Sequence, residues 1–188
     1  FRNQFEVNFF GLIEVTKAFL PLLGSNKDTN SPGKIINISS VSGKRALPYV
    51  APYSASKFAL EAFSDSLRRE LMLYGIDVVL IEPGPVKTAI WDKTPDPNNN
   101  AFIGTDYESS LKKFYSYVIE KGKEGLDVEK ISALILSIIN NKKPKTRYLI
   151  TPNKLRDYTM MGLFPDRIVD KIISKVLNIA KVKKKKAS

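Results

Sequence analysis

The sequence predicts an α/β fold in which helices cover both faces of an open, doubly wound parallel sheet. Helical and strand segments alternate along residues 2–82, and this alternation is typical of parallel strands joined by crossover helices. The strand candidates are continuous runs of β-branched and other apolar residues, which is typical of strands buried on both faces. The chain has 188 residues, of which 43% are hydrophobic and 26% charged, enough for one domain with a sizeable core.

Periodicity and terminating residues locate each element. Apolar residues at three- and four-residue spacing predict the helices, Pro21 and Gly75 end the first two, and short β-branched runs predict the strands. The predicted elements, in chain order, are a helix at 2–20, a strand at 34–40, a helix at 51–74, a strand at 77–82, helices near 107–120 and at 128–139, a strand at 147–151 and a helix at 165–180. We expect a single domain over 1–188, with an irregular insertion at 89–125 and a basic tail at 181–188.

The composition excludes several classes of chemistry. The sequence contains no cysteine and no histidine, which excludes disulfides, thiol nucleophiles, Ser-His-Asp triads and histidine-ligated metals. Acid–base chemistry must therefore come from Tyr, Lys, Asp or Glu, and we expect no metal. The sequence contains no stretch of about 18 uncharged apolar residues, so it predicts no membrane span. We expect a cytoplasmic location.

The net charge of +11 is concentrated at the end of the chain. Residues 181–188 contain five of the 30 basic side chains and no acid, whereas residues 61–92 contain more acids than bases. A nucleic-acid surface usually interleaves bases with aromatics along one face, and that pattern is absent outside the tail, so we expect no nucleic-acid partner. Lys44 and Arg45 are expected to be solvated loop charges.

Tyr53 and Lys57 are the strongest candidates for chemistry. They are four residues apart at the start of a predicted helix, so the phenol and the ammonium lie on one helical face. Tyr117 and Lys121 repeat this spacing, but only Tyr53 follows a buried strand. That strand ends in Ser39-Ser40, and the carboxyl ends of parallel strands form the crevice where such sheets bind ligands.

Elementary electrostatics supports a Tyr–Lys pair as an acid–base catalyst. An ammonium about 4 Å from a phenolate contributes on the order of 4 kcal/mol at an effective dielectric constant near 20. Lowering the pKa of a tyrosine from about 10 to near neutrality requires roughly the same free energy. One well-placed lysine is therefore sufficient.

Four groups of residues resemble the short-chain dehydrogenase/reductase family in order and largely in spacing: Asn8, Ser39-Ser40, the run from Tyr53 to Lys57, and the run from Pro83 to Thr88. The interval of thirteen residues before Tyr53 is the family's usual one, and it selects Ser40 over Ser39. The resemblance covers residues 2–90 and implies a Rossmann-type sheet.

The resemblance also implies a role for each residue. Tyr53 would exchange a proton, and Lys57 would be its electrostatic partner and a ribose ligand. Ser40 would hydrogen-bond the substrate oxygen, and Asn8 would hold a water that links Lys57 to solvent. The reaction implied is hydride transfer between NAD or NADP and a small-molecule alcohol or carbonyl. The implied cofactor contacts are Tyr53, Lys57, Pro83, Gly84, Val86 and Thr88.

One part of the family pattern is missing. The glycine-rich phosphate-binding loop, Thr-Gly-x-x-x-Gly-x-Gly, occurs nowhere in the sequence. We therefore expect a partial Rossmann-like domain without its N-terminal phosphate-binding part. The residue that distinguishes NAD from NADP in the family belongs to that part, so these residues do not distinguish the two cofactors. The chain opens inside a predicted helix and without Met, which suggests a longer polypeptide. An uncovered edge strand is expected to favour association.

Apolar residues late in the chain suggest a lipid-like substrate. Residues 89–125 and 153–165 stand where the family builds a substrate lid, and the sequence resembles the branch acting on retinoids, steroids and similar alcohols. Packing of helices on the core explains several of these residues equally well. The residues concerned are Ile90, Trp91, Phe102, Ile103, Tyr107, Phe114, Met160, Met161 and Phe164.

The last predicted helix is amphipathic. Its apolar stripe faces away from its lysines and precedes the basic tail, as in helices that lie on anionic membranes. The alternative is a helix docked on the core with a solvated tail. The stripe consists of Phe164, Ile168, Ile172, Val176 and Ile179.

Other interpretations of the whole chain stay open at this point. It is either an enzyme, or a non-catalytic interaction protein, or a peripheral membrane or nucleic-acid binder acting through residues 181–188. In the family, the helix at 51–74 packs against its copy in a second subunit, so we expect a homodimer or homotetramer.

Overall fold

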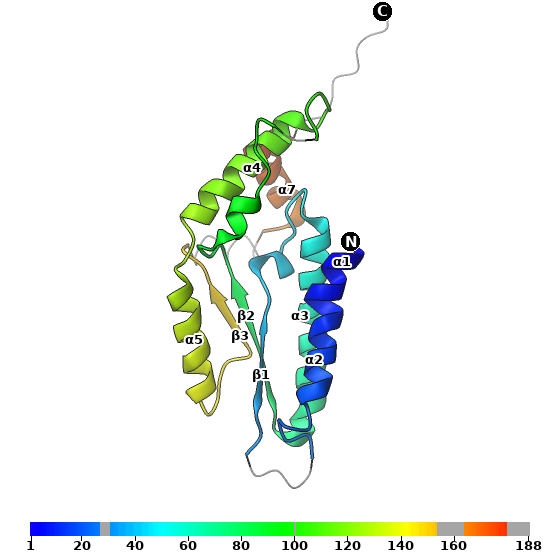
Figure 1. The fold of residues 1–188 in the computed structure, drawn as a ribbon, viewed down its shortest axis with the longest axis vertical. Helices are drawn as coiled ribbons and strands as arrows, with labels where there is room; N and C mark the ends of the chain where they lie inside the picture. The colour runs from blue at the N-terminus through cyan, green and yellow to red at the C-terminus, as the bar shows by residue number, and fades with distance from the viewer. Residues whose placement is uncertain (27–30, 100, 154–163, 180–188) are drawn as a thin grey trace, which may run out of the picture.

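The computed structural model has the predicted layered architecture (Figure 1). It describes residues 1–26, 31–99, 101–153 and 164–179. Three parallel strands form a sheet in the order β1, β2, β3. The strands are β1 (Lys34–Ile38), β2 (Asp77–Pro83) and β3 (Arg147–Ile150). The predicted α/β fold with a parallel sheet is confirmed.

The predicted helices are also confirmed, with ends shifted by a few residues. Among the described helices, none combines the length and hydropathy that a bilayer span requires. The α-helices are α1 (Arg2–Phe5), α2 (Gly11–Phe19), α3 (Ala51–Leu71), α4 (Glu108–Lys123), α5 (Val128–Asn140) and α7 (Asp166–Leu177). The short helical turns are η1 (Glu6–Phe10), η2 (Val41–Gly43), η3 (Met72–Tyr74) and η4 (Ala89–Lys93).

The predicted helix over residues 2–20 contains a wide turn. α1, η1 and α2 follow one another directly, and η1 is a π-helical turn in which the Gly11 N–H bonds the Glu6 carbonyl. Single π-turns inserted in α-helices occur frequently at functional sites. Asn8 lies within this turn.

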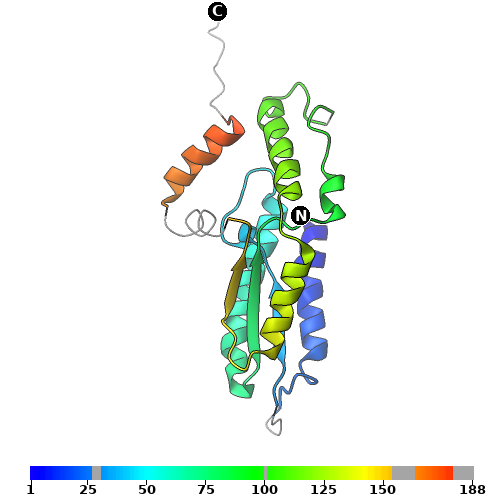
Figure 2. The same cartoon turned by 90° about the vertical axis from the view of Figure 1, so that its left-hand side faces the viewer.

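Two apolar layers hold the sheet between its helices. α2 and α3 cover one face and α5 covers the other, as the two views in Figures 1 and 2 agree. Side chains alternate between faces along a strand, so neighbouring residues of β2 enter different layers. The layer under α3 contains Ile35, Leu67, Leu71, Ile76 and Val78. The layer under α5 contains Val79, Ile81 and Ile138.

The carboxyl ends of the strands point toward the end of the molecule where α4 and α7 lie (Figure 1). Within the described residues, β1 pairs only with β2. An apolar groove of about 550 Å³ runs between β1 and α2, lined in part by Leu12, Val15 and Ile36.

Candidate active site

The site lies where β1 and β2 end side by side, with Ile38 paired to Ile81. Ser40 follows β1 in extended conformation and is buried, with 7% of its surface exposed. Its hydroxyl oxygen accepts a hydrogen bond from the Ser42 N–H at 3.1 Å, which caps η2. The hydroxyl of Ser39 is buried and has no hydrogen-bond partner among the described residues.

Tyr53 and Lys57 lie in the first turns of α3, which Pro52 helps to start. Lys57 Nζ is 5.9 Å from the centroid of the Tyr53 ring. The same Nζ donates a 2.8 Å hydrogen bond to the Ile38 carbonyl, so Lys57 connects α3 to the end of β1. Among the described residues, none forms a hydrogen bond with the Tyr53 hydroxyl, which leaves it free to meet a ligand.

Asn8 is tied to the same helix turn through a serine. Asn8 Nδ2 donates to Ser56 Oγ at 3.1 Å, and Ser56 Oγ donates to the Tyr53 carbonyl at 2.7 Å. Ser56 is fully buried. The π-turn thus brings Asn8 against the backbone that carries Tyr53, although the two are far apart in sequence.

The loop from Pro83 to Thr88 leaves the end of β2 and is fixed at several points. The Gly84 N–H donates to the Ile150 carbonyl at 2.8 Å, and a side chain at Gly84 would lie 2.7 Å from Thr151 Oγ1. Val86 forms an isolated bridge with Leu126, and its carbonyl accepts a 2.6 Å hydrogen bond from the Trp91 indole. Thr88 is exposed at the end of this loop.

The environment of Lys57 disfavours its charge only in part. Burial lowers the pKa of Lys57, because a low-dielectric surrounding disfavours the ammonium, and the negative charge of Glu61 opposes this effect. Glu61 lies one helical turn after Lys57 on α3. The catalytic candidate is therefore electrostatically linked to a buried carboxylate.

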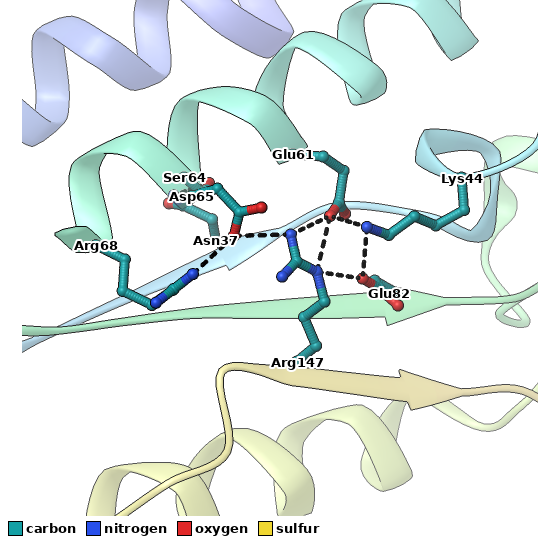
Figure 3. A network of polar contacts seen from close by, with 8 residues as sticks. All are labelled: Asn37, Lys44, Glu61, Ser64, Asp65, Arg68, Glu82 and Arg147. Carbon is teal, nitrogen blue, oxygen red and sulfur yellow. Dashed lines mark hydrogen bonds and ion pairs between the residues drawn. The ribbon is translucent and has the colours of Figure 1, made fainter.

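That carboxylate belongs to a network of buried charges that sequence reasoning missed (Figure 3). Glu61 and Glu82 are 5% and 4% exposed, and both contact Arg147 and Lys44. Burial, followed by the nearby charge of Glu61, raises the pKa of Glu82. One signal was available in the sequence: Glu82 directly follows the apolar run 78–81 within a predicted buried strand, and a buried carboxylate requires partners.

The expectation that Lys44 and Arg45 are solvated loop charges is wrong. Lys44 Nζ lies 2.9 Å from Glu61 Oε2, and Arg45 pairs with Asp166 and bonds the Phe164 carbonyl at 3.2 Å. Both arginine contacts come from residues more than a hundred positions away, so no local pattern could have predicted them. Arg45 thereby connects the loop after Ser40 to the start of α7.

The predicted lid residues within the described part of the chain range from buried to exposed, and Trp91 is half-buried. Phe114 is buried and packs on the Tyr49 ring, with centroids 5.4 Å apart, while the Tyr49 hydroxyl donates to Ser110 Oγ at 2.5 Å. Tyr49 has a positive φ of 69°, a strained backbone for a non-glycine residue. The exposed members are Ile90, Phe102, Ile103, Tyr107 and Phe164. Met160, Met161 and the tail at 181–188 lie outside the described residues.

Comparisons with known proteins agree on a family. A family model described as short chain dehydrogenase matches residues 1–99. The chain is 46% identical over 176 residues to the NADPH-dependent 3-dehydrocapnine reductase of Ornithobacterium rhinotracheale, covering 94% of this chain and 62% of that protein. It is 33% identical over 178 residues to retinol dehydrogenase 16 of Homo sapiens, covering 89% and 54% respectively.

A solved structure has the same fold. A short-chain dehydrogenase from Streptomyces avermitilis superposes with a TM-score of 0.67 at 25% sequence identity, over 96% of this chain and 62% of that one. The chain thus spans between half and two thirds of the length of the proteins it matches. The resemblance noted in the motifs is confirmed at the level of the family.

Proposed function

The chain belongs to the short-chain dehydrogenase family, and we propose that it carries the catalytic residues of an NADPH-dependent reductase that acts on a ketone of a lipid-like molecule. The observation that carries the proposal is the joint position of Tyr53, Lys57 and Ser40. All three lie at the carboxyl ends of strands or directly above them, where open parallel sheets bind ligands.

The residues present fit one half of a nicotinamide cofactor. Lys57 uses one of its three N–H groups on the Ile38 carbonyl, which leaves donors for ribose hydroxyls. Pro83, Gly84, Val86 and Thr88 would hold the nicotinamide end, because they form the fixed loop at the end of the neighbouring strand. The glycine-rich loop that would hold the adenine half does not occur in the 188 residues. When bound, the cofactor supplies the hydride.

Residues of the chain itself donate the proton to the substrate oxygen and replace it afterwards. In the direction of reduction, Tyr53 donates its hydroxyl proton to the substrate oxygen as the carbonyl carbon gains the hydride, so the carbonyl becomes an alcohol and Tyr53 becomes a phenolate. The Lys57 ammonium stabilises that phenolate, and Ser40 hydrogen-bonds the same substrate oxygen. A proton from solvent, passed by way of Lys57 and a water at Asn8, restores the tyrosine.

Substrate class and direction come from the relatives and from the lid. The relative with 46% identity is named as an NADPH-dependent reductase of a 3-dehydro compound, and another relative is a dehydrogenase of retinol, a lipid-like alcohol. The exposed apolar residues of the lid segment, such as Ile90 and Tyr107, suit a substrate of this kind.

The test replaces Tyr53 by Phe in the protein as its gene encodes it. With NADPH and a long-chain 3-keto lipid as substrate, we expect Tyr53→Phe to lower kcat by a factor of about 10² to 10⁴, because a positioned proton donor contributes that much. NADPH affinity, measured by fluorescence titration, should change by less than a few fold. Tyr117→Phe is the matched control, since Tyr117 and Lys121 have the same spacing on α4 and should be dispensable.

Two outcomes contradict the proposal. Turnover retained in Tyr53→Phe would exclude Tyr53 as the proton donor. Absence of hydride transfer to every ketone tried, with either NADPH or NADH, would favour the non-catalytic interaction protein instead.

We further propose that α7 places this end of the molecule on an anionic membrane. The helix docks through Val169 and Leu177, which are buried, while all five residues of the apolar stripe predicted from the sequence are exposed. An exposed apolar stripe, followed in the sequence by the lysines of 181–188, suits a lipid surface. We expect binding to vesicles containing phosphatidylserine and not to phosphatidylcholine vesicles, and deletion of 181–188 should abolish it. Unchanged binding after the deletion would reject this proposal.

We also propose self-association through α3. Phe58 lies on this helix with 44% of its surface exposed. Sedimentation should give the mass of a dimer or tetramer, and Phe58→Lys should lower it; a monomeric wild-type protein would contradict this.

A further inference from the structure

We infer that the buried charge network of Lys44, Glu61, Glu82 and Arg147 positions the helix that carries Tyr53 and Lys57 against the Pro83–Thr88 loop, and that Glu61 acts directly on Lys57. The inference rests on the proposed function, since it assigns a task to residues around the proposed catalytic pair. We refer to these four residues as the Arg147 network.

The four members come from four separate segments, and three of them adjoin a part of the site. Lys44 is four residues after Ser40, at the end of η2. Glu61 is four residues after Lys57 on α3. Glu82 directly precedes the Pro83–Thr88 loop on β2. Arg147, the first residue of β3, lies between the two carboxylates (Figure 3).

The contacts make Arg147 and Lys44 bridges between α3 and β2. Arg147 Nη2 is 3.2 Å from Glu61 Oε2, and Arg147 Nε is 3.2 Å from Glu82 Oε1. Lys44 Nζ is 2.9 Å from Glu61 Oε2 and 3.7 Å from Glu82 Oε1. Each cation therefore contacts both carboxylates, and two positive charges balance two negative ones.

Burial makes these contacts geometrically demanding. Glu61 and Glu82 are nearly inaccessible to water, so a carboxylate that lost its cation could not be solvated in compensation. Any sliding of α3 along β2 separates a carboxylate from a cation. The network therefore fixes the distance between Lys57, one turn from Glu61, and the loop that begins after Glu82.

Several charged or polar groups surround Lys57. On its own helix they are Tyr53 one turn before and Glu61 one turn after, and from β1 the Ile38 carbonyl accepts its hydrogen bond. Lys44 from the η2 loop and Arg147 from β3 contact Glu61, and both also contact Glu82 of β2. Because burial lowers the pKa of Lys57 and Glu61 opposes that effect, removing the Glu61 charge should lower this pKa further.

The test compares Glu61→Gln with Asp65→Asn in the protein as its gene encodes it. Asp65 lies one turn further along α3 and contacts the same Arg147 Nη2 at 2.9 Å, so it is a matched control without influence on Lys57. The readout is trace acetylation of each lysine across pH, quantified by mass spectrometry, which needs no turnover. In Glu61→Gln, the midpoint for Lys57 should move to lower pH, because the negative charge that favours its ammonium is gone. In Asp65→Asn it should stay unchanged.

Arg147→Lys tests the positioning part separately. It keeps the positive charge but cannot bridge two carboxylates in the manner of a planar guanidinium. We expect the KM for NADPH to rise several fold while the Lys57 midpoint stays where it is in the wild type.

The outcomes separate this inference from the proposed function. Equal Lys57 midpoints in Glu61→Gln and the wild type would overturn the action of Glu61, and an unchanged KM in Arg147→Lys would overturn the positioning role. Both could fail while Tyr53→Phe still lowered kcat as expected, in which case only this inference is lost. If Tyr53→Phe retained turnover, the proposed function would fail, and the acetylation result would still decide whether Glu61 acts on Lys57.

Discussion

The two faces of the sheet contact their helices through different kinds of interaction, and β2 shows the contrast within one strand. Val79 and Ile81 enter the apolar layer under α5. On the other face, Val78 is apolar, but Glu82 at the carboxyl end meets the charges of α3 and β3 (Figure 3). The α5 face is thus entirely apolar in its buried layer, whereas the α3 face changes from apolar to ionic toward the site.

This difference bears on Tyr53 and Lys57, which lie on α3. Apolar burial is non-directional and permits small shifts of a helix over a sheet. Charge pairs and hydrogen bonds such as Asn37 Nδ2 to Ser64 Oγ, at 2.9 Å, permit far fewer relative positions. A helix that must present Tyr53 and Lys57 within a few tenths of an ångström gains from the second kind of contact.

The largest effect is expected on the apolar face. Ile81→Ala removes a side chain that is 0% exposed between α5 and the sheet, and we expect the free energy of unfolding to fall by about 4 kcal/mol through lost burial and a residual cavity. Urea denaturation at two pH values should give the same loss, because no charge changes. A loss that depended strongly on pH would mean that the two faces are not independent.

A smaller but pH-dependent effect is expected on the ionic face. Arg147→Met leaves Glu61 and Glu82 with Lys44 alone, and we expect a destabilisation of about 2 to 3 kcal/mol near neutral pH, reduced from a fully buried case because Arg147 is partly exposed. Protonation of Glu82 should remove part of this penalty, so the loss should shrink as pH falls. The same loss at all pH values would contradict an ionic origin.

Glu82→Gln should hardly change stability at neutral pH but should change its pH dependence. Burial raises the pKa of Glu82 above its ordinary value of 4.5, so the folded state binds a proton that the unfolded state has released. Stability contributed by this group is therefore full below about pH 4.5 and falls as pH rises through the folded-state pKa. Glu82→Gln should lack that decline. Above the folded-state pKa, its free energy of unfolding should lie between that of the wild type and a value about 1 kcal/mol higher.

The control for this experiment is the wild-type curve measured in the same buffers, because all other carboxyl groups cancel in the difference. Identical slopes for wild type and Glu82→Gln between about pH 4 and 8 would refute a raised pKa at Glu82.

The elements of the fold could be predicted from the sequence because their signals are local. Helical periodicity, Gly75 in its left-handed conformation (φ 70°) and the apolar runs of β1 and β2 each lie within a few residues of the feature they determine. The π-turn at Asn8 gave no such signal, since it depends on how the helix meets Ser56 of α3. The positions of the helices and strands along the chain were therefore predictable from the sequence, whereas the π-turn within one helix was not.

The site could be predicted only in part for the same reason. Tyr53, Lys57 and Ser40 stand out through spacing and strand context, and their roles remain proposals. The partners of Glu61 are 17, 21 and 86 residues away in sequence, and Arg147 and Lys44 resemble surface charges until the fold brings them together. Such contacts are properties of the three-dimensional arrangement and not of any sequence window.

The smallest effect is expected at the rim of the ionic face, where Asp65 pairs with Arg147 at 2.9 Å and with Arg68 at 3.2 Å. The hydrogen bond from Arg147 lowers the pKa of Asp65 below 3.8, so its contribution is present above that pH and is lost as pH falls through the folded-state pKa. Because the Asp65 side chain is partly exposed, we expect Asp65→Asn to cost less than about 1 kcal/mol near neutral pH.

Salt separates this rim from the buried centre of the network. Exposed pairs are screened by ions and buried pairs much less so. Raising the ionic strength to about 1 M should therefore remove most of the difference between Asp65→Asn and the wild type, while leaving the effect of Arg147→Met largely in place. If salt removed both differences equally, Glu61 and Glu82 would be accessible to water in solution. The charged contacts would then fix the position of α3, which carries Tyr53 and Lys57, no more tightly than apolar packing does.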